Sequence, residues 1–386
     1  MIPRTIFAEE HEMFRTSVRR FIEAEILPHH DEWQKAGITP RSLWLKAGES
    51  GLLCPSVSEE YGGVGADFLF SAIIIEELAF ANTPDIAFYT HSDIAAPYIM
   101  EFGTEAQKRS LLPKMVAGEK IVSLAMSEPD AGSDLASMKT SAVRDGDDFV
   151  INGSKVFITN GHNADLYVLA CKTNPEARRQ GISLILVEAD RPGFSKGRML
   201  EKVGLKAQDT AEISFSDVRV PVSNLLGAEN KGFAHMMTSL GQERLVQAVR
   251  AVAASEAALR MTIDYTIQRS AFGQPIADFQ AMQFRFAELH SQIIGQRTLI
   301  DRCIELLVAG ELDPVDAAAA KLSSTEVQAR VIDECVTCFG GWGYMWEYPI
   351  ARAYADARAA RLAGGTTDIM KLIVGRALVK ERKDAL

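Results

Sequence analysis

Two short segments in the middle of the chain carry residue types that could hold a flat, polar ligand. The loop AMSEPDAGSD (residues 125–134) combines glycine, hydroxyls and backbone N–H groups, which can face the anionic or polar edge of a ligand. In KVFITNG (residues 155–161), Phe157 and Thr159 share one face of an expected strand, where a ring can pack on a heteroaromatic ligand and a hydroxyl can bond to it. A plain surface turn and an ordinary half-buried strand remain the alternatives.

Two glycine-containing segments near the C-terminus could bring the backbone close to a ligand. The glycines of FGGWGYMWEYPIARAYAD (residues 339–356) permit a close approach of the main chain to another surface. AGGTTDIMKLIVGR (residues 363–376) is a glycine turn that opens a final helix, and such an N-terminus can hold an anion or a carbonyl oxygen. The alternatives are an aromatic turn between two helices and an ordinary helix start.

The cysteines do not indicate a metal or redox centre. They are few, odd in number and scattered, so a disulfide framework is not expected: Cys54, Cys171, Cys303, Cys335 and Cys338. Cys335 and Cys338 form a single C-x-x-C, but no second pair exists, and the motif falls in a helical pattern. We therefore expect two small buried thiols, no metal site and a reducing compartment.

The elements that must position these segments form three blocks, and the predicted fold class is mainly α with a small β domain. Residues 1–120 are predicted to be an α-helical domain, because apolar residues recur at near-helical spacing from residue 7 onwards. Residues 121–232 are predicted to be a β domain, since short β-rich runs replace that period. Residues 233–386 are predicted to be a helical bundle, because a 3–4 spacing continues over six turns from residue 286 to residue 307.

Two dipeptides in the β block predict tight hairpins. Asp145-Gly146 and Asn152-Gly153 both lie between short β-rich runs, and both are typical of two-residue hairpin turns.

Charge and hydropathy exclude two broad classes of protein. The 386-residue chain has 41 basic and 51 acidic residues, a net charge of −10, and no basic block, so nucleic-acid binding is not expected. No apolar run approaches the length of a membrane-spanning helix. An amphipathic helix begins almost at the N-terminus and leaves no room for a targeting leader, so we expect a cytoplasmic protein without a membrane span.

Taken together, these segments closely resemble the acyl-CoA dehydrogenase family, and most of all its long-chain branch. The resemblance runs from the first helix to the last and includes four signature segments: AMSEPDAGSD, GLKAQDTAE, QRSAFGQPI and GGWGYMWEYPIARAYAD. It implies an N-terminal helical domain, a middle β-barrel or sandwich and a C-terminal four-helix bundle. It also implies an FAD-dependent activity, in which an acyl-CoA loses its α-proton and β-hydride and becomes a trans-2-enoyl-CoA.

The resemblance implies an uncommon position for the catalytic base. In much of the family a glutamate stands just before the final Gly-Thr, where this chain has Gly364. The long-chain and isovaleryl branches carry the glutamate on an earlier helix, where this chain has Glu243, in GQERL. Glu243 is therefore implied to be the α-proton base. The backbone N–H of Gly364 is implied to form an oxyanion hole together with a ribityl hydroxyl of the flavin.

The resemblance also implies contacts with cofactor and substrate. FAD contacts carry over to the β domain, the bundle and the final turn: Ser127, Ser133, Phe157, Thr159, Arg269, Gln280, Gly340, Gly341, Thr366 and Asp368. Substrate contacts carry over to Ser133, Arg244, Ala363 and Gly365. The small Ala363 and Gly364 are expected to widen the pocket near the reacting carbons and to favour a long or branched acyl chain.

The implied partners are an acyl-CoA substrate, electron-transfer flavoprotein and further copies of the chain. In the family a neighbouring subunit completes the FAD site, which implies a homo-oligomer, usually a tetramer built as a dimer of dimers. Two alternatives remain open: another flavin chemistry on the same fold, as in an acyl-CoA oxidase or a flavin monooxygenase, and a non-catalytic acyl-CoA-binding protein. Oxidases tend to be longer, and Glu243 argues against the non-catalytic alternative.

Overall fold

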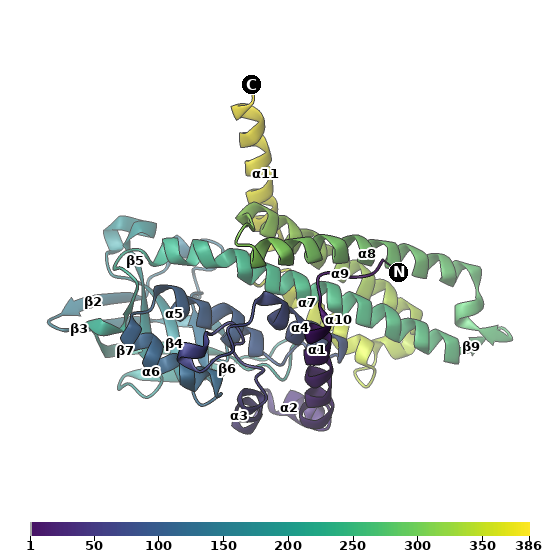
Figure 1. The fold of residues 1–386 in the computed structure, drawn as a ribbon, viewed down its shortest axis with the longest axis horizontal. Helices are drawn as coiled ribbons and strands as arrows, with labels where there is room; N and C mark the ends of the chain where they lie inside the picture. Colours follow the sequence, from purple (N-terminus) through teal and green to yellow (C-terminus); the bar gives the residue numbers. More distant parts are fainter. Residues whose placement is uncertain (1) are drawn as a thin grey trace.

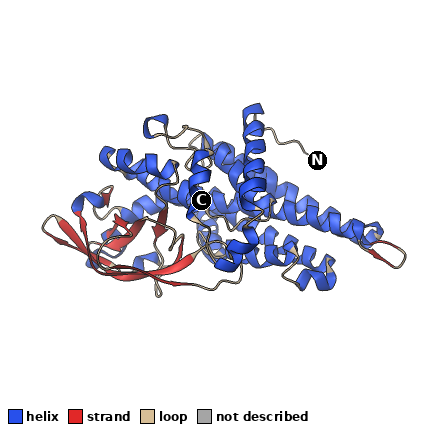
Figure 2. Cartoon of the chain, turned by 90° about the horizontal axis from the view of Figure 1, so that it is seen from below, coloured by secondary structure: helices blue, strands red, loops and turns tan. Residues whose placement is uncertain are grey.

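The computed structural model describes residues 2–386, and its eight-stranded sheet is separated in space from the long C-terminal helices (Figure 1). In Figure 1 the β domain forms one end of an elongated molecule, and the long C-terminal helices extend to the other end. Figure 2 shows the same separation from below, with one short hairpin of strands at the opposite tip. The predicted class, mainly α with a small β domain, is confirmed.

Short helices form the N-terminal block, and α4 lies at its centre. The helices are α1 (Glu9–Phe21), α2 (His30–Ala36), α3 (Arg41–Glu49), α4 (Phe68–Phe80), α5 (Ala96–Phe102) and α6 (Glu105–Val116). Nearly every residue of α4 is buried, because the helix is apolar on all sides and packs between α1 and the bundle helix α7. The carboxylate of Asp67 caps its first turn by accepting a hydrogen bond from the backbone N–H of Leu69.

One sheet of eight strands makes up the β domain. The strands are β1 (Val122–Ala125), β2 (Ser141–Asp145), β3 (Asp148–Thr159), β4 (Leu166–Lys172), β5 (Ile182–Glu188), β6 (Phe194–Met199), β7 (Thr210–Pro221) and β8 (Leu225–Leu226). Their order is β6-β7-β3-β2-β4-β5-β8, and β1 pairs with β4. The central strands β4 and β5 are buried along almost their whole length, which explains their continuous apolar sequences.

One predicted hairpin is confirmed and the other is wrong. The Asp145-Gly146 turn joins β2 to β3 as expected. Asn152-Gly153 instead lies inside β3, which continues through it with a shift in register. Glycine is required here for close packing, because a Cβ on Gly153 would lie only 2.5 Å from Oγ1 of Thr140.

Five helices follow the β domain. They are α7 (Gly232–Gln268), α8 (Gln280–Val308), α9 (Pro314–Cys338), α10 (Pro349–Ala360) and α11 (Thr367–Asp384). The middle of α7 is buried because α4, α8, α9 and α10 all pack against it. The helix predicted from the spacing of residues 286–307 is confirmed as α8. Cys335 and Cys338 are buried free thiols at the end of α9, as expected. No helix within residues 2–386 combines the length and the apolarity needed to cross a membrane.

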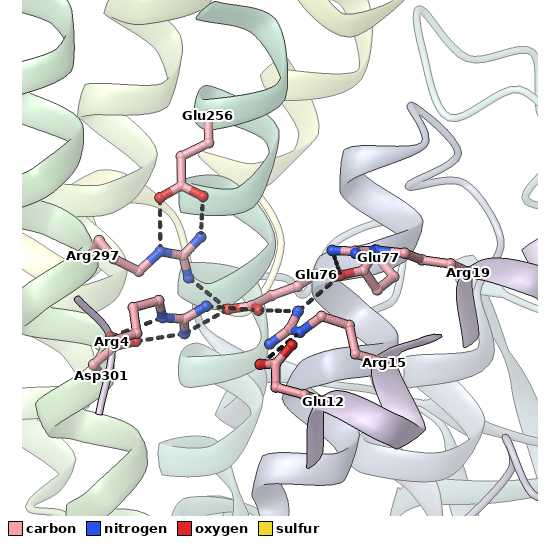
Figure 3. A network of polar contacts seen from close by, with 9 residues as sticks. All are labelled: Arg4, Glu12, Arg15, Arg19, Glu76, Glu77, Glu256, Arg297 and Asp301. Carbon is pink, nitrogen blue, oxygen red and sulfur yellow. Dashed lines mark hydrogen bonds and ion pairs between the residues drawn. The ribbon is translucent and has the colours of Figure 1, made fainter. Parts of the chain in front are cut away.

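A cluster of ion pairs joins the N-terminal block to the bundle (Figure 3). Glu76 on α4 lies at its centre, and its carboxylate accepts hydrogen bonds of 2.6 to 3.0 Å from Arg4, Arg15 and Arg297. The other members are Glu12, Arg19, Glu77, Glu256 and Asp301. Each guanidinium of this cluster meets at least one carboxylate, so the burial of these charges is compensated.

Candidate active site

Glu243 is buried on α7, on the face that meets α5. The residue is 5% exposed, and the hydroxyl of Tyr98 donates a 2.9 Å hydrogen bond to its Oε1. Burial raises the pKa of Glu243 to about 7, although the bond from Tyr98 and the charge of Arg244 act in the opposite direction. A carboxylate whose pKa is near neutrality is suited to take up a proton from a weak carbon acid and to release it afterwards.

The glycine turn before α11 adjoins the same helix. Gly364 and Gly365 have φ angles of 65° and 93°, a left-handed backbone in which any side chain would be strained. A Cβ placed on Gly364 would have a single neighbour within 4 Å, the Cγ of Gln247 at 3.6 Å. Gln247 follows Glu243 by four residues on α7, so the two side chains share one face of the helix. Glu243 therefore lies on the face that adjoins the glycine turn.

Lys321 on α9 holds this turn, and the sequence analysis did not identify it. The side chain is fully buried, and its ammonium group donates a hydrogen bond to the carbonyl oxygen of Gly365. Burial, together with the charge of Arg244, lowers the pKa of Lys321 to about 8. Its signal in the sequence is a lysine directly after four alanines, on a helix whose alanines are packed against neighbours.

An irregularity in β3 exposes the ring of Phe157. The pairing of β3 with β7 shifts in register between Lys155 and Ile158, and Phe157 adopts a φ of 62°. The residue is left 68% exposed, with half-buried Thr159 two positions further on. Thr210, the β7 partner of Thr159, is buried with no partner for its hydroxyl among residues 2–386. An exposed ring beside two threonine hydroxyls fits a flat ring system with a polar edge.

The loop of residues 125–134 is anchored against the same strand. The carboxylate of Glu128 accepts a 2.8 Å hydrogen bond from the ammonium group of Lys155. The backbone N–H of Val156 donates to the carbonyl oxygen of Ser127. Ser127 therefore lies beside β3, whereas Ser133 lies further along the loop and is exposed.

The remaining residues predicted to contact FAD form two separate groups. One is the start of α11, where the side-chain oxygen of Thr366 caps the helix and Asp368 is exposed. The other group is exposed at the far end of the bundle, where α7 ends, α8 begins and α9 ends: Arg269, Gln280, Gly340 and Gly341. That end, which the short strand β9 (Ser270–Ala271) marks in Figure 1, lies opposite the β domain. A single copy of the chain does not bring these four residues to Phe157.

Of the four residues predicted to contact substrate, Arg244 lies on α7, Ala363 and Gly365 lie in the turn before α11, and Ser133 lies on the exposed loop of the β domain. Arg244 is buried, and its Nη1 donates a 3.3 Å hydrogen bond to the carbonyl oxygen of Pro314, while its Nε has no partner in the described chain. Burial lowers the pKa of this guanidinium. Ala363 is exposed in the turn before α11, and Gly365 is held by Lys321.

Comparison with known proteins assigns the chain to a family. Models described as the N-terminal, middle and C-terminal domains of acyl-CoA dehydrogenase match residues 8–119, 123–218 and 230–379. The chain is 49% identical to the mitochondrial long-chain specific acyl-CoA dehydrogenase of Sus scrofa, over 98% of this chain and 89% of that protein. The chain belongs to the acyl-CoA dehydrogenase family.

Other relatives agree with this assignment. The chain is 35% identical to the mitochondrial isovaleryl-CoA dehydrogenase of Oryza sativa subsp. japonica, over 97% of this chain and 93% of that protein. The crystal structure of an acyl-CoA dehydrogenase from Geobacillus kaustophilus matches with a TM-score of 0.96 at 49% identity, covering 97% of this chain and all of that one. Acyl-CoA dehydrogenases are FAD-dependent oxidoreductases, so the predicted family, enzyme class and cofactor are confirmed.

Tyr98, which the sequence analysis also did not identify, is expected to set the pH at which this acyl-CoA dehydrogenase works. Tyr98→Phe removes a hydrogen bond that lowers the pKa of Glu243. A hydrogen bond to a charged group contributes about 1.5–3 kcal/mol, which corresponds to about one to two pKa units. Because only the ionised carboxylate can accept a proton, kcat/KM should fall on the acid side of about pH 7 in the wild type, and at higher pH in the variant.

The measurement is the pH dependence of kcat/KM for Tyr98→Phe and for a matched control. Tyr354→Phe removes a hydroxyl from an exposed tyrosine of α10 and is expected to leave the profile unchanged. An acid limb at the same pH in wild type and Tyr98→Phe would contradict the role of Tyr98.

Lys321→Met is expected to slow turnover by loosening the glycine turn. Methionine is similar in length to lysine but donates no hydrogen bond, so the carbonyl oxygen of Gly365 loses its charged partner. We expect kcat to fall about 10- to 100-fold, with FAD content close to wild type, as measured by steady-state kinetics. Lys35→Met, at an exposed position of α2, is the control, and equal losses in both variants would contradict a specific role for Lys321.

Proposed function

We propose that this chain catalyses the α,β-dehydrogenation of an acyl-CoA thioester, with Glu243 as the base that takes the α-proton. One observation carries the proposal: α7 buries a carboxylate with a pKa of about 7, on the face that the Gly364 turn adjoins. The turn itself has no carboxylate. FAD, when bound, supplies the two-electron acceptor for the β-hydride, and the product is a trans-2-enoyl-CoA.

Groups of this chain are proposed to take up the α-proton and to stabilise the negative charge that develops in this reaction. Negative charge accumulates on the thioester oxygen as the α-proton leaves, and the backbone N–H of Gly364 is proposed to donate to that oxygen. Lys321 keeps the turn in place through the carbonyl of Gly365. Tyr98 orients the carboxylate of Glu243 by hydrogen bonding to one of its oxygens. Arg244 and Ala363 are proposed to contact the substrate, together with Ser133 and Gly365.

The FAD site is proposed to be shared between copies of the chain. Within one copy, the proposed contacts are Ser127, Ser133, Phe157, Thr159, Thr366 and Asp368. The opposite end of the bundle would serve the FAD of a neighbour through Arg269, Gln280, Gly340 and Gly341, and the separation of the two groups supports this division. The projecting helix α11 also supports contact with another copy, because Leu372, Leu378 and Val379 are exposed on it. The proposed assembly is a homotetramer, a dimer of dimers.

The proposed acyl chain is long or branched. Relatives named for long-chain and isovaleryl substrates support this class, as do the small residues Ala363 and Gly364 in the turn. The proposed electron acceptor is electron-transfer flavoprotein. The proposed process is fatty-acid β-oxidation, and the proposed location is the cytoplasm.

Anaerobic titration of the FAD-loaded protein tests the proposed function. Butyryl-, octanoyl-, palmitoyl- and branched acyl-CoAs are added while the blue absorption of the flavin is followed. Rapid bleaching by the long or branched thioesters is the expected result. Bound FAD that no acyl-CoA bleaches would overturn the proposal and favour a protein that only binds acyl-CoA.

A further inference from the structure

Arg250 is a buried arginine whose hydrogen bonds go only to neutral groups. It lies on α7 and is 5% exposed. Its Nη1 donates a 2.7 Å hydrogen bond to the hydroxyl of Tyr89, and its Nη2 donates a 2.8 Å bond to Oε1 of Gln247. Among residues 2–386 no carboxylate oxygen lies within the 4.0 Å of an ion pair with this guanidinium. A buried positive charge is therefore left without a direct counter-ion.

Of the other three arginines that are buried within residues 2–386, two are matched by carboxylates, and Arg244 donates only to a backbone carbonyl. Arg15 pairs with Glu76 and Glu77, and Arg297 pairs with Glu76 and Glu256 (Figure 3). An uncompensated buried charge costs several kcal/mol, and an anion placed beside it would remove that cost.

Asp356 is an acidic residue whose pKa is affected by the charge of Arg250. Burial, and then repulsion from Asp85, raise the pKa of Asp356 to about 7, while the hydrogen bond from Leu205 and the charge of Arg250 act in the opposite direction. Asp356 already accepts a hydrogen bond from the backbone N–H of Leu205, and no ion pair joins it to Arg250. It is therefore a weak counter-ion at neutral pH.

Arg250 lies on the same face of α7 as the catalytic base. Glu243, Gln247 and Arg250 follow one another at intervals of four and three residues, and all three are buried. Two helical turns, about 10 Å along the axis, separate Glu243 from Arg250. Gln247, between them, is the only residue that a Cβ on Gly364 would meet within 4 Å. The α7 residue nearest the glycine turn is therefore the one that accepts a hydrogen bond from Arg250.

A line of hydrogen bonds also connects Arg250 to the strand proposed to face FAD. Tyr89, which accepts from Arg250, donates a 3.2 Å hydrogen bond to Oε1 of Gln208. The amide of Gln208 donates a 3.1 Å bond to the hydroxyl of Thr159. Hydrogen bonds thus link the guanidinium of Arg250 to Thr159, on the strand proposed to face FAD.

We propose that Arg250 binds the free carboxylate of a dicarboxylic acid monothioester, an acyl-CoA whose chain ends in a carboxylate. This inference rests on the proposed function and specifies its substrate class. A tail carboxylate would replace Oε1 of Gln247 as the acceptor for Arg250, and the hydroxyl of Tyr89 lies beside it. The redox chemistry is unchanged: the α-proton passes to Glu243, the β-hydride passes to FAD, a C=C bond forms, and the tail carboxylate does not react.

The test compares octanoyl-CoA with suberoyl-CoA, which have equal carbon chains but end in a methyl group and a carboxylate. FAD-loaded wild type is expected to use suberoyl-CoA with a kcat/KM about 10- to 100-fold higher, because a hydrogen bond to a charged group has that effect. Arg250→Met is expected to abolish the preference, and Arg250→Lys to keep part of it. The ratio of the two substrates is measured within each protein, so differences in folding or FAD content cancel.

The outcomes separate this inference from the proposed function. Wild type that is bleached by octanoyl-CoA and shows no preference for suberoyl-CoA would overturn the inference alone, without any variant having to fold. An unchanged preference in Arg250→Met would also overturn it, because the carboxylate would then be recognised elsewhere. If no acyl-CoA bleaches the flavin, the proposed function fails, and this inference fails with it.

Discussion

Glu243→Gln is expected to stop flavin reduction by acyl-CoA without loss of bound FAD. Glutamine has nearly the same shape and still offers an oxygen to the hydroxyl of Tyr98, but it cannot take up a proton. Removing a positioned general base lowers a rate by about 10² to 10⁴. The measurement is the rate of anaerobic bleaching of the flavin after rapid mixing with substrate, together with the FAD content of the purified variant.

A matched control makes the same change at a nearby carboxylate. Glu101→Gln lies on α5, the helix that carries Tyr98, but Glu101 is exposed, and its variant is expected to bleach at the wild-type rate. Wild-type bleaching by Glu243→Gln would show that the base has been assigned to the wrong residue.

Moving the carboxylate to the glycine turn is expected to restore part of the activity. In the Glu243→Gln background, Gly364→Glu has room for a side chain, since its Cβ would meet only the Cγ of Gln247, at an ordinary 3.6 Å. The left-handed φ of 65° costs about 1–2 kcal/mol, so the rescue is expected to be incomplete. Gly364→Gln in the same background carries the same strain without a base. Equal rates in the two double variants would contradict the prediction that a carboxylate at position 364 can replace Glu243 as the base.

Glu76→Gln is expected to lower the free energy of unfolding by about 3–5 kcal/mol, the usual effect of removing one partner of a buried ion pair. Glu76 is fully buried, and the variant would leave Arg4, Arg15 and Arg297 around a neutral amide. Burial alone would raise the pKa of Glu76, but these three guanidinium groups together lower it to about 2. The measurement is the midpoint of urea unfolding of the FAD-loaded protein.

The sign of the pH dependence follows from the lowered pKa. The pKa of an unfolded glutamate is about 4.3, so the stabilisation by Glu76 is complete above that pH and is lost as the pH falls towards the folded-state pKa of about 2. The difference between wild type and Glu76→Gln is therefore expected to shrink over this range. Glu60→Gln breaks an exposed pair with Arg109 and is expected to cost less than about 1 kcal/mol. Equal losses in the two variants would contradict the central role of Glu76.

The sequence by itself determined the mainly α class with a small β domain and the family to which the chain belongs. Apolar spacing from residue 286 to residue 307 predicted α8, because a helix that packs on one side repeats its apolar residues every three to four positions. The same reading predicted the Asp145-Gly146 hairpin. The signature segments indicated the fold and the cofactor. A glycine at position 364, together with a glutamate at position 243, indicated that the base lies on the earlier helix. These features are local in the chain, or are carried by motifs that can be recognised one at a time.

The tertiary structure alone decided how those residues are surrounded. Asn152-Gly153 has the composition of a hairpin, but Thr140 packs against it and the strand continues. The partner of Glu243 is a tyrosine 145 residues away, and burial, which no local pattern specifies, raises the pKa of the carboxylate to about 7. Arg250 has an ordinary position in the sequence, and the four alanines before Lys321 indicate close packing but not the partner of its ammonium group. The chemistry of both residues follows from desolvation and from the groups placed next to them, and both depend on packing between segments that are far apart in the chain.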